Sequence, residues 1–360
     1  MCSAFIFLRT KMNIIKENFS QYFHRPTKVQ IDVTNKCNFD CRYCYNKNND
    51  FLGQTEFSDE QLLLLVDKVI KELDPVVVSF SGGEALIRKD VLIKAISKLK
   101  DTDIYSWLTT NASLMNKDLA ITLKEVGLNK IFTNIDSNNQ DVHDFLRGFK
   151  GSLSKSLRII KDLVPVFGGD NVIGTSVVTK ENYKSIIDSA RLAVELGVSR
   201  YHLLDFIPIS KHSQKLMLSK DEWLELKDDI EKSEIAKNIK LQLCHSFLFM
   251  SDEYKKMSFP FCMAGRFTMV ITASGEVVPC NHLKKKDFFC GSVFEQNLLD
   301  IWQKSEILKK FRYYDYLDKG CGNCKRYAQC IGGCKAMAYM LKKDAFGVDP
   351  YCQEFNSHEI

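Results

Sequence analysis

Short apolar runs alternate with longer amphipathic segments between residues 28 and 208. The short runs are rich in β-branched residues, as buried strands of a parallel sheet are, and the longer segments repeat apolar residues at helical spacing. The pattern predicts strands at Val29–Val33, Val76–Phe80, Ile104–Leu108, Lys130–Asn134, Val172–Val178 and Tyr201–Phe206. It predicts helices at Asp59–Glu72, Val91–Leu99, Lys117–Val126, Leu153–Leu163 and Tyr183–Leu196.

These alternating elements predict an α/β fold with six βα units and a parallel sheet. Closing an eight-unit barrel takes about 250 residues, and only about 180 lie in this stretch, so we expect an open or partial (β/α)6 barrel. Ser58 and Asn182 each precede a predicted helix and are expected to be its N-cap.

The composition and the predicted elements of the chain change after the last predicted strand. Residues 216–258 are charged and predict helices that bridge two parts, and from Phe261 onward short strands, turns and cysteines follow. Phe267–Thr272 and Glu276–Val278 flank a turn and predict a hairpin, and Leu298–Phe311 and Cys334–Leu341 predict helices. We expect four parts, namely an extension (1–27), a barrel (28–215), a bridge (216–258) and a cysteine-rich domain (259–360), with Met12 as an alternative start.

Charge and hydropathy argue against two classes of partner. The 360 residues carry a net charge of +5 with both signs interspersed, which predicts no nucleic-acid partner. Lys284–Lys286 is the only basic triplet, and we expect it in a solvated loop. No apolar stretch approaches the ~18 residues that cross a bilayer, so no membrane partner is expected. A signal peptide is also missing, which predicts a cytoplasmic protein.

Thirteen cysteines in a reducing compartment indicate metal or cluster ligands rather than disulfides. Ten of them form two spaced sets. The first set is Cys37, Cys41 and Cys44, and the second is Cys262, Cys280, Cys321, Cys324, Cys330, Cys334 and Cys352. The first set follows the first strand, at the end of the sheet where parallel α/β folds place their chemistry. Its C-x3-C-x2-C spacing provides three thiolates for a four-iron cluster and leaves one iron open. A zinc site is the alternative, although structural zinc prefers four ligands.

Polar residues follow the next strands and are expected on the same rim. Gly82 and Gly83 would let a ligand approach the backbone, and Glu84 could bind its ammonium group. Tyr43 would shield the cluster. Further candidates to bind a nucleoside-type ligand or its carboxylate are Asn111, Asn134, Asp136 and Arg147. For each of these alone, a helix cap or a loop hydrogen bond is an equal alternative.

The segment Cys37–Cys44, followed by Gly82-Gly83-Glu84, resembles the radical S-adenosylmethionine (SAM) superfamily. The seven later cysteines, with Gly275 between the first two of them, resemble the SPASM domain of enzymes that mature peptides and proteins. The resemblance implies that the first cysteine set holds a 4Fe-4S cluster that binds S-adenosylmethionine, with cofactor contacts at Gly83, Asn134 and Arg147.

The same resemblance implies two auxiliary 4Fe-4S clusters. One would be held by Cys321, Cys324, Cys330 and Cys352, and the other by Cys262, Cys280 and Cys334. Some relatives carry a further cysteine where this chain has Lys256, so the second cluster would have an open iron or a ligand from Cys244 or Cys290. Those two cysteines are also candidate hydrogen-atom donors, and a role as plain buried thiols is the alternative.

The resemblance implies a 5′-deoxyadenosyl radical that takes a hydrogen atom from the substrate, which is then oxidised. Asn281 stands where anaerobic sulfatase maturases carry an aspartate base. We therefore expect crosslinking of a ribosomally made peptide through a C–C, C–O or thioether bond, with sulfatase maturation or peptide epimerisation as alternatives. The implied partners are a peptide or protein, a flavodoxin- or ferredoxin-type electron donor and a separate leader-binding protein. The contrasting class is a non-catalytic metal-binding regulator.

Overall fold

The computed structural model describes residues 24–243, 262–313 and 330–352. Its strands form one ten-stranded sheet in the order β10-β9-β8-β1-β2-β3-β4-β5-β6-β7. Neighbouring strands from β1 to β7 are parallel, β8 joins β1 in parallel, and β9 and β10 continue antiparallel. The strands are β1 (Lys28–Thr34), β2 (Val77–Gly82), β3 (Tyr105–Thr109), β4 (Lys130–Asn134), β5 (Val172–Val178), β6 (Arg200–Asp205), β7 (Lys240–Leu243), β8 (Thr268–Ile271), β9 (Glu276–Val278) and β10 (Gly291–Ser292).

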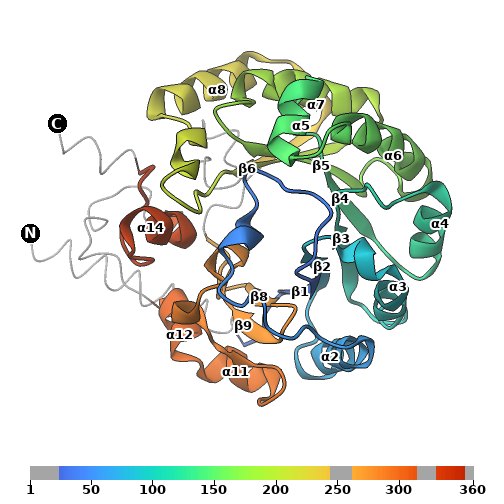
Figure 1. Ribbon diagram of the computed structural model, residues 1–360, viewed down its shortest axis with the longest axis vertical. Helices are drawn as coiled ribbons and strands as arrows, with labels where there is room; N and C mark the ends of the chain where they lie inside the picture. Colours follow the sequence, from blue (N-terminus) through green and yellow to red (C-terminus); the bar gives the residue numbers. More distant parts are fainter. Residues whose placement is uncertain (1–23, 244–261, 314–329, 353–360) are drawn as a thin grey trace, which may run out of the picture.

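Helices cover the convex side of the curved sheet, and the chain crosses from strand to helix around an open arc (Figure 1). The α-helices are α2 (Asp59–Glu72), α3 (Lys89–Ser97), α4 (Lys117–Glu125), α5 (Gln140–Arg147), α6 (Ser152–Phe167), α7 (Ile186–Glu195), α8 (Lys220–Lys232), α9 (Ile235–Asn238), α11 (Leu298–Lys304), α12 (Glu306–Tyr313) and α14 (Lys335–Lys342). Single 3-10 turns are η2 (Tyr45–Asn48), η3 (Ala85–Arg88), η4 (Tyr183–Ser185), η5 (Ser213–Leu216), η7 (Asn281–Leu283) and η8 (Lys286–Phe288).

Apolar and polar residues alternate along β1, and this pattern places them on opposite faces of the sheet. Val29, Ile31 and Val33 belong to the main apolar core, whereas Gln30 and Asp32 make polar contacts with one another and with other elements. Successive side chains of a strand point to opposite faces, so the apolar residues meet the outer helices and the polar ones line the inner side. The inner face of the arc is therefore polar near the carboxyl end of β1.

The expected partial barrel is confirmed, and most predicted elements agree within two residues at their ends. β4, β5 and α2 match their predicted bounds. The side chain of Ser58 caps α2 as expected, in a capping box with Gln61. The predicted hairpin is β8–β9, paired antiparallel. The predicted helix over Leu298–Phe311 is instead two helices, α11 and α12, which are separated at Ser305.

The sheet is wider than the six predicted strands. Residues 216–258 were expected to be a helical bridge, yet within their described part β7 follows α9 and pairs with β6. At the opposite end β8 extends the sheet next to β1, although some 240 residues separate the two strands (Lys28 pairs with Thr268). β10 and β7 lie at the two ends of the described sheet.

None of the helices in the described residues combines the length and apolar character that crossing a membrane requires.

Candidate functional site

The loop after β1 carries the first three cysteines. Cys37 is exposed, Cys44 is half-buried, and Cys41 is buried with 8% of its surface exposed. Burial raises the pKa of the Cys41 thiol to about 11, so a thiolate at this position requires a positive partner such as a metal. Three thiols on one short loop, at the carboxyl end of a central strand, fit a cluster with one open iron.

Gly82 and Gly83 bring the end of β2 against this loop. The Gly83 N–H donates to the Thr34 carbonyl at 2.7 Å, and the Glu84 N–H donates to the Lys36 carbonyl at 2.8 Å. A Cβ atom at position 83 would overlap the Lys36 carbonyl oxygen. The missing side chains face the carbonyls of Thr34 and Lys36, and the approach of a ligand to these two glycines stays a prediction.

Glu84 is fully buried and links the ends of β2 and β3. Its carboxylate accepts hydrogen bonds from the Thr110 hydroxyl and the Asn111 N–H, both at 2.7 Å. Burial raises the pKa of Glu84, although these hydrogen bonds oppose the rise. The carboxylate therefore joins the ends of two strands, and its expected contact with an ammonium group stays a prediction. The side-chain amide of Asn111 contacts the cysteine loop, donating to Asn38 at 2.9 Å and lying 3.9 Å from the sulfur of Cys37.

The C-terminal end of α5 contacts the cysteine loop from another side. The Arg42 N–H donates to the Leu146 carbonyl at 2.8 Å. Gly148 caps α5 with a φ of 60°, a conformation that favours glycine. A side chain there would also overlap the carbonyl oxygen of Asp40. Neither α5 nor Gly148 was predicted from the sequence.

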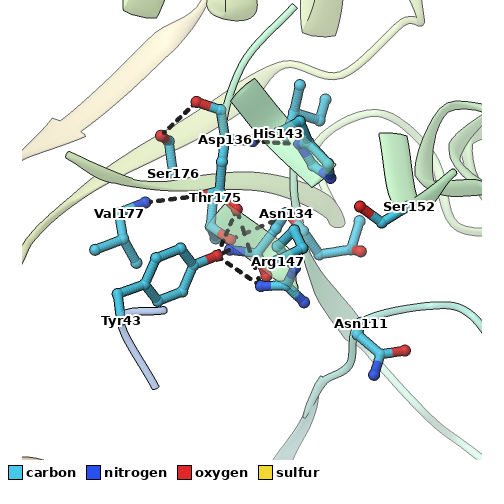
Figure 2. Close-up of polar contacts among 12 residues, drawn as sticks. Tyr43, Asn111, Asn134, Asp136, His143, Arg147, Ser152, Thr175, Ser176 and Val177 are labelled. Carbon is cyan, nitrogen blue, oxygen red and sulfur yellow. Dashed lines mark hydrogen bonds and ion pairs between the residues drawn. The ribbon is translucent and has the colours of Figure 1, made fainter. Parts of the chain in front are cut away.

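Tyr43, from the cysteine loop, meets three of the predicted rim residues (Figure 2). Its hydroxyl donates to the carboxylate of Asp136 and accepts from Nη1 of Arg147 at 2.7 Å. The side chain of Asn134 lies 3.5 Å from the same hydroxyl, and the Arg147–Asp136 ion pair spans 3.9 Å. Asp136 also accepts from the Val177 N–H at 3.0 Å. The predicted convergence is thus present, but Asp136 and Arg147 contact each other and Tyr43.

His143 contacts the backbone of Asp136, a member of this group. Its Nδ1 atom accepts from the Asp136 N–H at 3.1 Å, and burial lowers the pKa of His143 to about 4, so the ring is neutral at pH 7. Asn182 donates to the Asp136 carbonyl at 2.7 Å. Asn182 makes no side-chain cap to the helix that follows, so its prediction as an N-cap is wrong. Its side chain is used to position Asp136.

A second polar group lies on the inner face of β1. Lys284, 1% exposed, forms an ion pair with Asp32 and donates to Asn46 at 3.2 Å. Beside it the amides of Gln30 and Asn281 exchange two hydrogen bonds, of 2.6 and 2.8 Å. The prediction of a solvated Lys284 is wrong because η7 packs its loop against η2 and β1. Asn281 is therefore an amide with a fixed amide partner.

The later cysteines gather where the C-terminal elements pack. The side chains of Cys262, Cys280 and Cys334 share one apolar cluster with residues of η7, η8, α12 and α14. Cys330 lies within electrostatic reach of Cys352. The division of these cysteines between two clusters stays a prediction. Cys321 and Cys324 lie outside the described residues, as do Cys244 and Lys256.

Cys290, the remaining candidate, packs beside the main core. Its thiol donates to the Phe288 carbonyl at 3.3 Å, and burial raises the pKa of Cys290 to about 12. The contact fits a protonated, buried thiol. Its role as a ligand or hydrogen-atom donor stays a prediction.

Two family models match the regions just described. The "Radical SAM superfamily" model matches residues 31–193, and the "Iron-sulfur cluster-binding domain" of SPASM proteins matches residues 262–325. The chain belongs to the radical SAM superfamily. The radical SAM domain implies S-adenosylmethionine and a 4Fe-4S cluster, and the SPASM domain implies auxiliary iron–sulfur clusters.

Similar proteins cover nearly the whole of this radical SAM enzyme. The AdoMet-dependent heme synthase of Methanosarcina barkeri is 26% identical over 91% of this chain and 96% of its own length. The enzyme of the same name from Oleidesulfovibrio alaskensis is 25% identical over 90% and 86%.

Solved structures share the fold. SuiB of Streptococcus suis bound to S-adenosylmethionine superposes with a TM-score of 0.72 at 19% identity, over 91% of this chain and 77% of that one. Native anSMEcpe with bound AdoMet gives 0.71 at 18% identity, over 92% and 95%.

Proposed function

We propose that this radical SAM/SPASM enzyme oxidatively modifies a ribosomally synthesised peptide. One observation carries the oxidative character of the reaction. Pairing of β8 with β1 brings η7, which directly follows Cys280, into contact with η2, which directly follows Cys44. An electron acceptor bound near Cys280 would thus lie close to the loop that carries Cys37, Cys41 and Cys44.

The proposed cofactors are bound by the residues described above. Cys37, Cys41 and Cys44 hold the first cluster, and the seven later cysteines hold the auxiliary ones. Together with S-adenosylmethionine, these groups supply a 5′-deoxyadenosyl radical and a one-electron acceptor. Asn134 and Arg147 face the cofactor, and Tyr43 and Asp136 keep the Arg147 guanidinium in place.

The carboxylates of the site are all paired with other groups, which supports a peptide rather than a sulfatase as the substrate. Asp32 is paired with Lys284, Asp136 with Tyr43, and Glu84 with the end of β3. Position 281, expected to be a base in sulfatase maturases, is an amide that is bonded to Gln30. An amide cannot accept a proton.

Exposed Cys37 supports the entry point that we propose for electrons. The exposed side chains of Lys36 and Arg42 lie on the loop that carries it, and exposed Lys47 forms an ion pair with Asp40 of the same loop. A flavodoxin- or ferredoxin-type donor, with an acidic surface, would be attracted to this side of the molecule.

Heme synthesis is the second candidate function, because the curated relatives that match over nearly their full length are AdoMet-dependent heme synthases. That function requires an iron–porphyrin precursor in place of a peptide.

Anaerobic turnover separates these functions. We expect reconstituted enzyme to hold ~8 to 12 irons and, with dithionite, to convert S-adenosylmethionine to 5′-deoxyadenosine. Short peptides encoded beside the gene should stimulate this conversion and lose mass as hydrogen is removed.

Two other outcomes would contradict the peptide proposal. Stimulation by an iron–porphyrin precursor alone would favour heme synthesis, and stoichiometric zinc without cleavage of S-adenosylmethionine would indicate a non-catalytic regulator. The matched control replaces Cys37, Cys41 and Cys44 with alanine.

A further inference from the structure

Arg266 is a buried cation in the turn between Cys262 and β8. The turn is fixed by hydrogen bonds from the Arg266 and Phe267 N–H groups to the Met263 carbonyl, at 3.2 and 3.0 Å. Gly265 of the same turn packs so closely on Phe311 that a Cβ atom would lie 2.9 Å from that side chain. The backbone therefore holds Arg266 in a defined place.

Arg266 is 2% exposed, and its guanidinium is only partly hydrogen-bonded. Nη1 donates to the Cys262 carbonyl at 3.1 Å. Nη2 is buried and has no hydrogen-bond partner among the residues that the structure describes. A buried guanidinium is stable only beside a compensating negative charge, because removing a charge from water costs several kcal/mol.

A second cation lies nearby. Lys335 begins α14 directly after Cys334, is fully buried, and donates to the carbonyls of Ile331 and Gly333 at 2.8 and 2.9 Å. These carbonyls solvate the ammonium but carry no charge. Lys335 lies within electrostatic reach of Arg266 and of the thiols of Cys262, Cys330 and Cys334.

A buried carboxylate, Asp349, lies near these groups. Asp349, 3% exposed, accepts from the N–H groups of Cys334 at 2.7 Å and Tyr351 at 2.9 Å. Nη2 of Arg266 still has no carboxylate partner among the residues that the structure describes, and protonated thiols would not supply a negative charge beside it. Thiolates that hold iron and sulfide would, because an iron–sulfur cluster with cysteine ligands is an anion.

We propose that Arg266 is the buried positive charge that balances the auxiliary iron–sulfur cluster next to Cys262 and raises its reduction potential. Net charge and hydrogen bonds around a cluster set its potential, and a fixed cation favours the reduced, more negative state. A higher potential makes this cluster the better acceptor for an electron from a substrate radical. The inference rests on the proposed presence of a cluster in this domain.

The test compares full-length chains in which Cys37, Cys41 and Cys44 are alanine, so that all bound iron belongs to the C-terminal region. In this background, Arg266→Gln removes the charge and Arg266→Lys keeps it. Lys342→Gln removes an exposed charge from the end of α14 and is the matched control. Iron content and potential, followed by EPR during anaerobic redox titration, are the two readouts.

We expect Arg266→Gln to lower the reduced-to-oxidised ratio at a given potential at least tenfold, which is about 59 mV for one electron. Arg266→Lys and Lys342→Gln should stay close to the parent. If Arg266→Gln fails to bind iron while Arg266→Lys binds it, the charge is required for assembly and the proposal is supported.

Three results would overturn it. Arg266→Gln could match the parent in both iron and potential, or the lysine variant could be affected as much as the glutamine variant, which would indicate a role of shape. A parent chain without iron would remove the cluster itself, and with it the proposed function.

Discussion

At the scale of single residues, the cysteine loop is positioned by backbone contacts more than by side chains. The end of β2 and the cap of α5 both approach it at glycines, Gly83 and Gly148, where a Cβ atom would overlap a carbonyl oxygen of the loop. The three thiols can therefore be pre-arranged before a cluster binds. Pre-arrangement reduces the entropy that cluster assembly has to overcome.

Gly83→Ala should disturb this arrangement. The added methyl group has to displace the Lys36 carbonyl, which moves the backbone beside Cys37. We expect loss of roughly four irons per chain and at least tenfold slower 5′-deoxyadenosine formation, measured by iron assay and chromatography. Gly347→Ala is the control, since the nearest atom to its Cβ would lie 3.3 Å away. Equal iron in both variants would contradict a positioning role for Gly83.

The buried pair Lys284–Asp32 makes a second prediction at this scale. Lys284→Met should lower the free energy of unfolding by about 3–5 kcal/mol, because it leaves the Asp32 carboxylate buried without its cation. Combining it with Asp32→Asn should recover most of that loss. Urea unfolding of the four chains of this double-mutant cycle measures the coupling. Additive effects of the two substitutions would mean that the ion pair contributes nothing.

At the scale of elements, local patterns predicted what local physics determines. β4 follows from alternating burial, β5 from a continuous buried run and α2 from a helical repeat, and Ser58 caps α2 because its side chain satisfies a free N–H group there. The pairing of β8 with β1 was not predicted, because it joins segments about 240 residues apart and leaves no periodic signal. For the same reason Gly148 was not predicted and Lys284 was predicted wrongly, because each contacts a segment far away in the sequence.

α2 shows how the N-terminal and C-terminal elements are joined. The Lys68 ammonium donates to the carbonyls of Val293 and Gln296, both at 2.7 Å, and Glu72 accepts from the N–H of Leu298 at 2.6 Å. One helix face thus fixes the segment that leads into α11. The sheet and this helix together hold the C-terminal elements beside β1.

Lys68→Met should weaken that junction. It removes two charge-assisted hydrogen bonds and leaves two carbonyls without their donor, so we expect a loss of about 1–3 kcal/mol in unfolding free energy and faster proteolysis after β10. Lys71→Met, on the same helix but exposed, is the matched control. The junction would be unimportant if both variants melted and were cleaved alike.

At the scale of the whole molecule, the curved sheet brings cysteine loops from the N-terminal and C-terminal parts of the chain close together. The first cysteine loop follows β1, and the loop with Cys280 follows β9, which is separated from β1 only by β8. Between them lies the Gln30–Asn281 amide pair, which links the two regions without a titratable group.

Acidification should lower the free energy of unfolding through His143. Its pKa is about 4 in the folded chain and 6.5 in an unfolded one, because burial disfavours the charged ring, while Asp136 and Asp144 favour it and Arg147 opposes it. Between these values the unfolded state binds the extra proton, so this contribution to stability is complete above pH 6.5 and decreases as pH falls toward 4. We expect a loss of about 2 kcal/mol in the free energy of unfolding at pH 5 relative to pH 7 from this group.

The substitution His143→Asn tests this expectation, because asparagine retains an acceptor for the Asp136 N–H. It should lower the free energy of unfolding at pH 7 but reduce its dependence on pH. His212→Gln, at an exposed position, should keep the parent's pH dependence. Anaerobic urea unfolding at both pH values measures the difference, and an unchanged pH dependence in His143→Asn would assign the acid sensitivity to other groups.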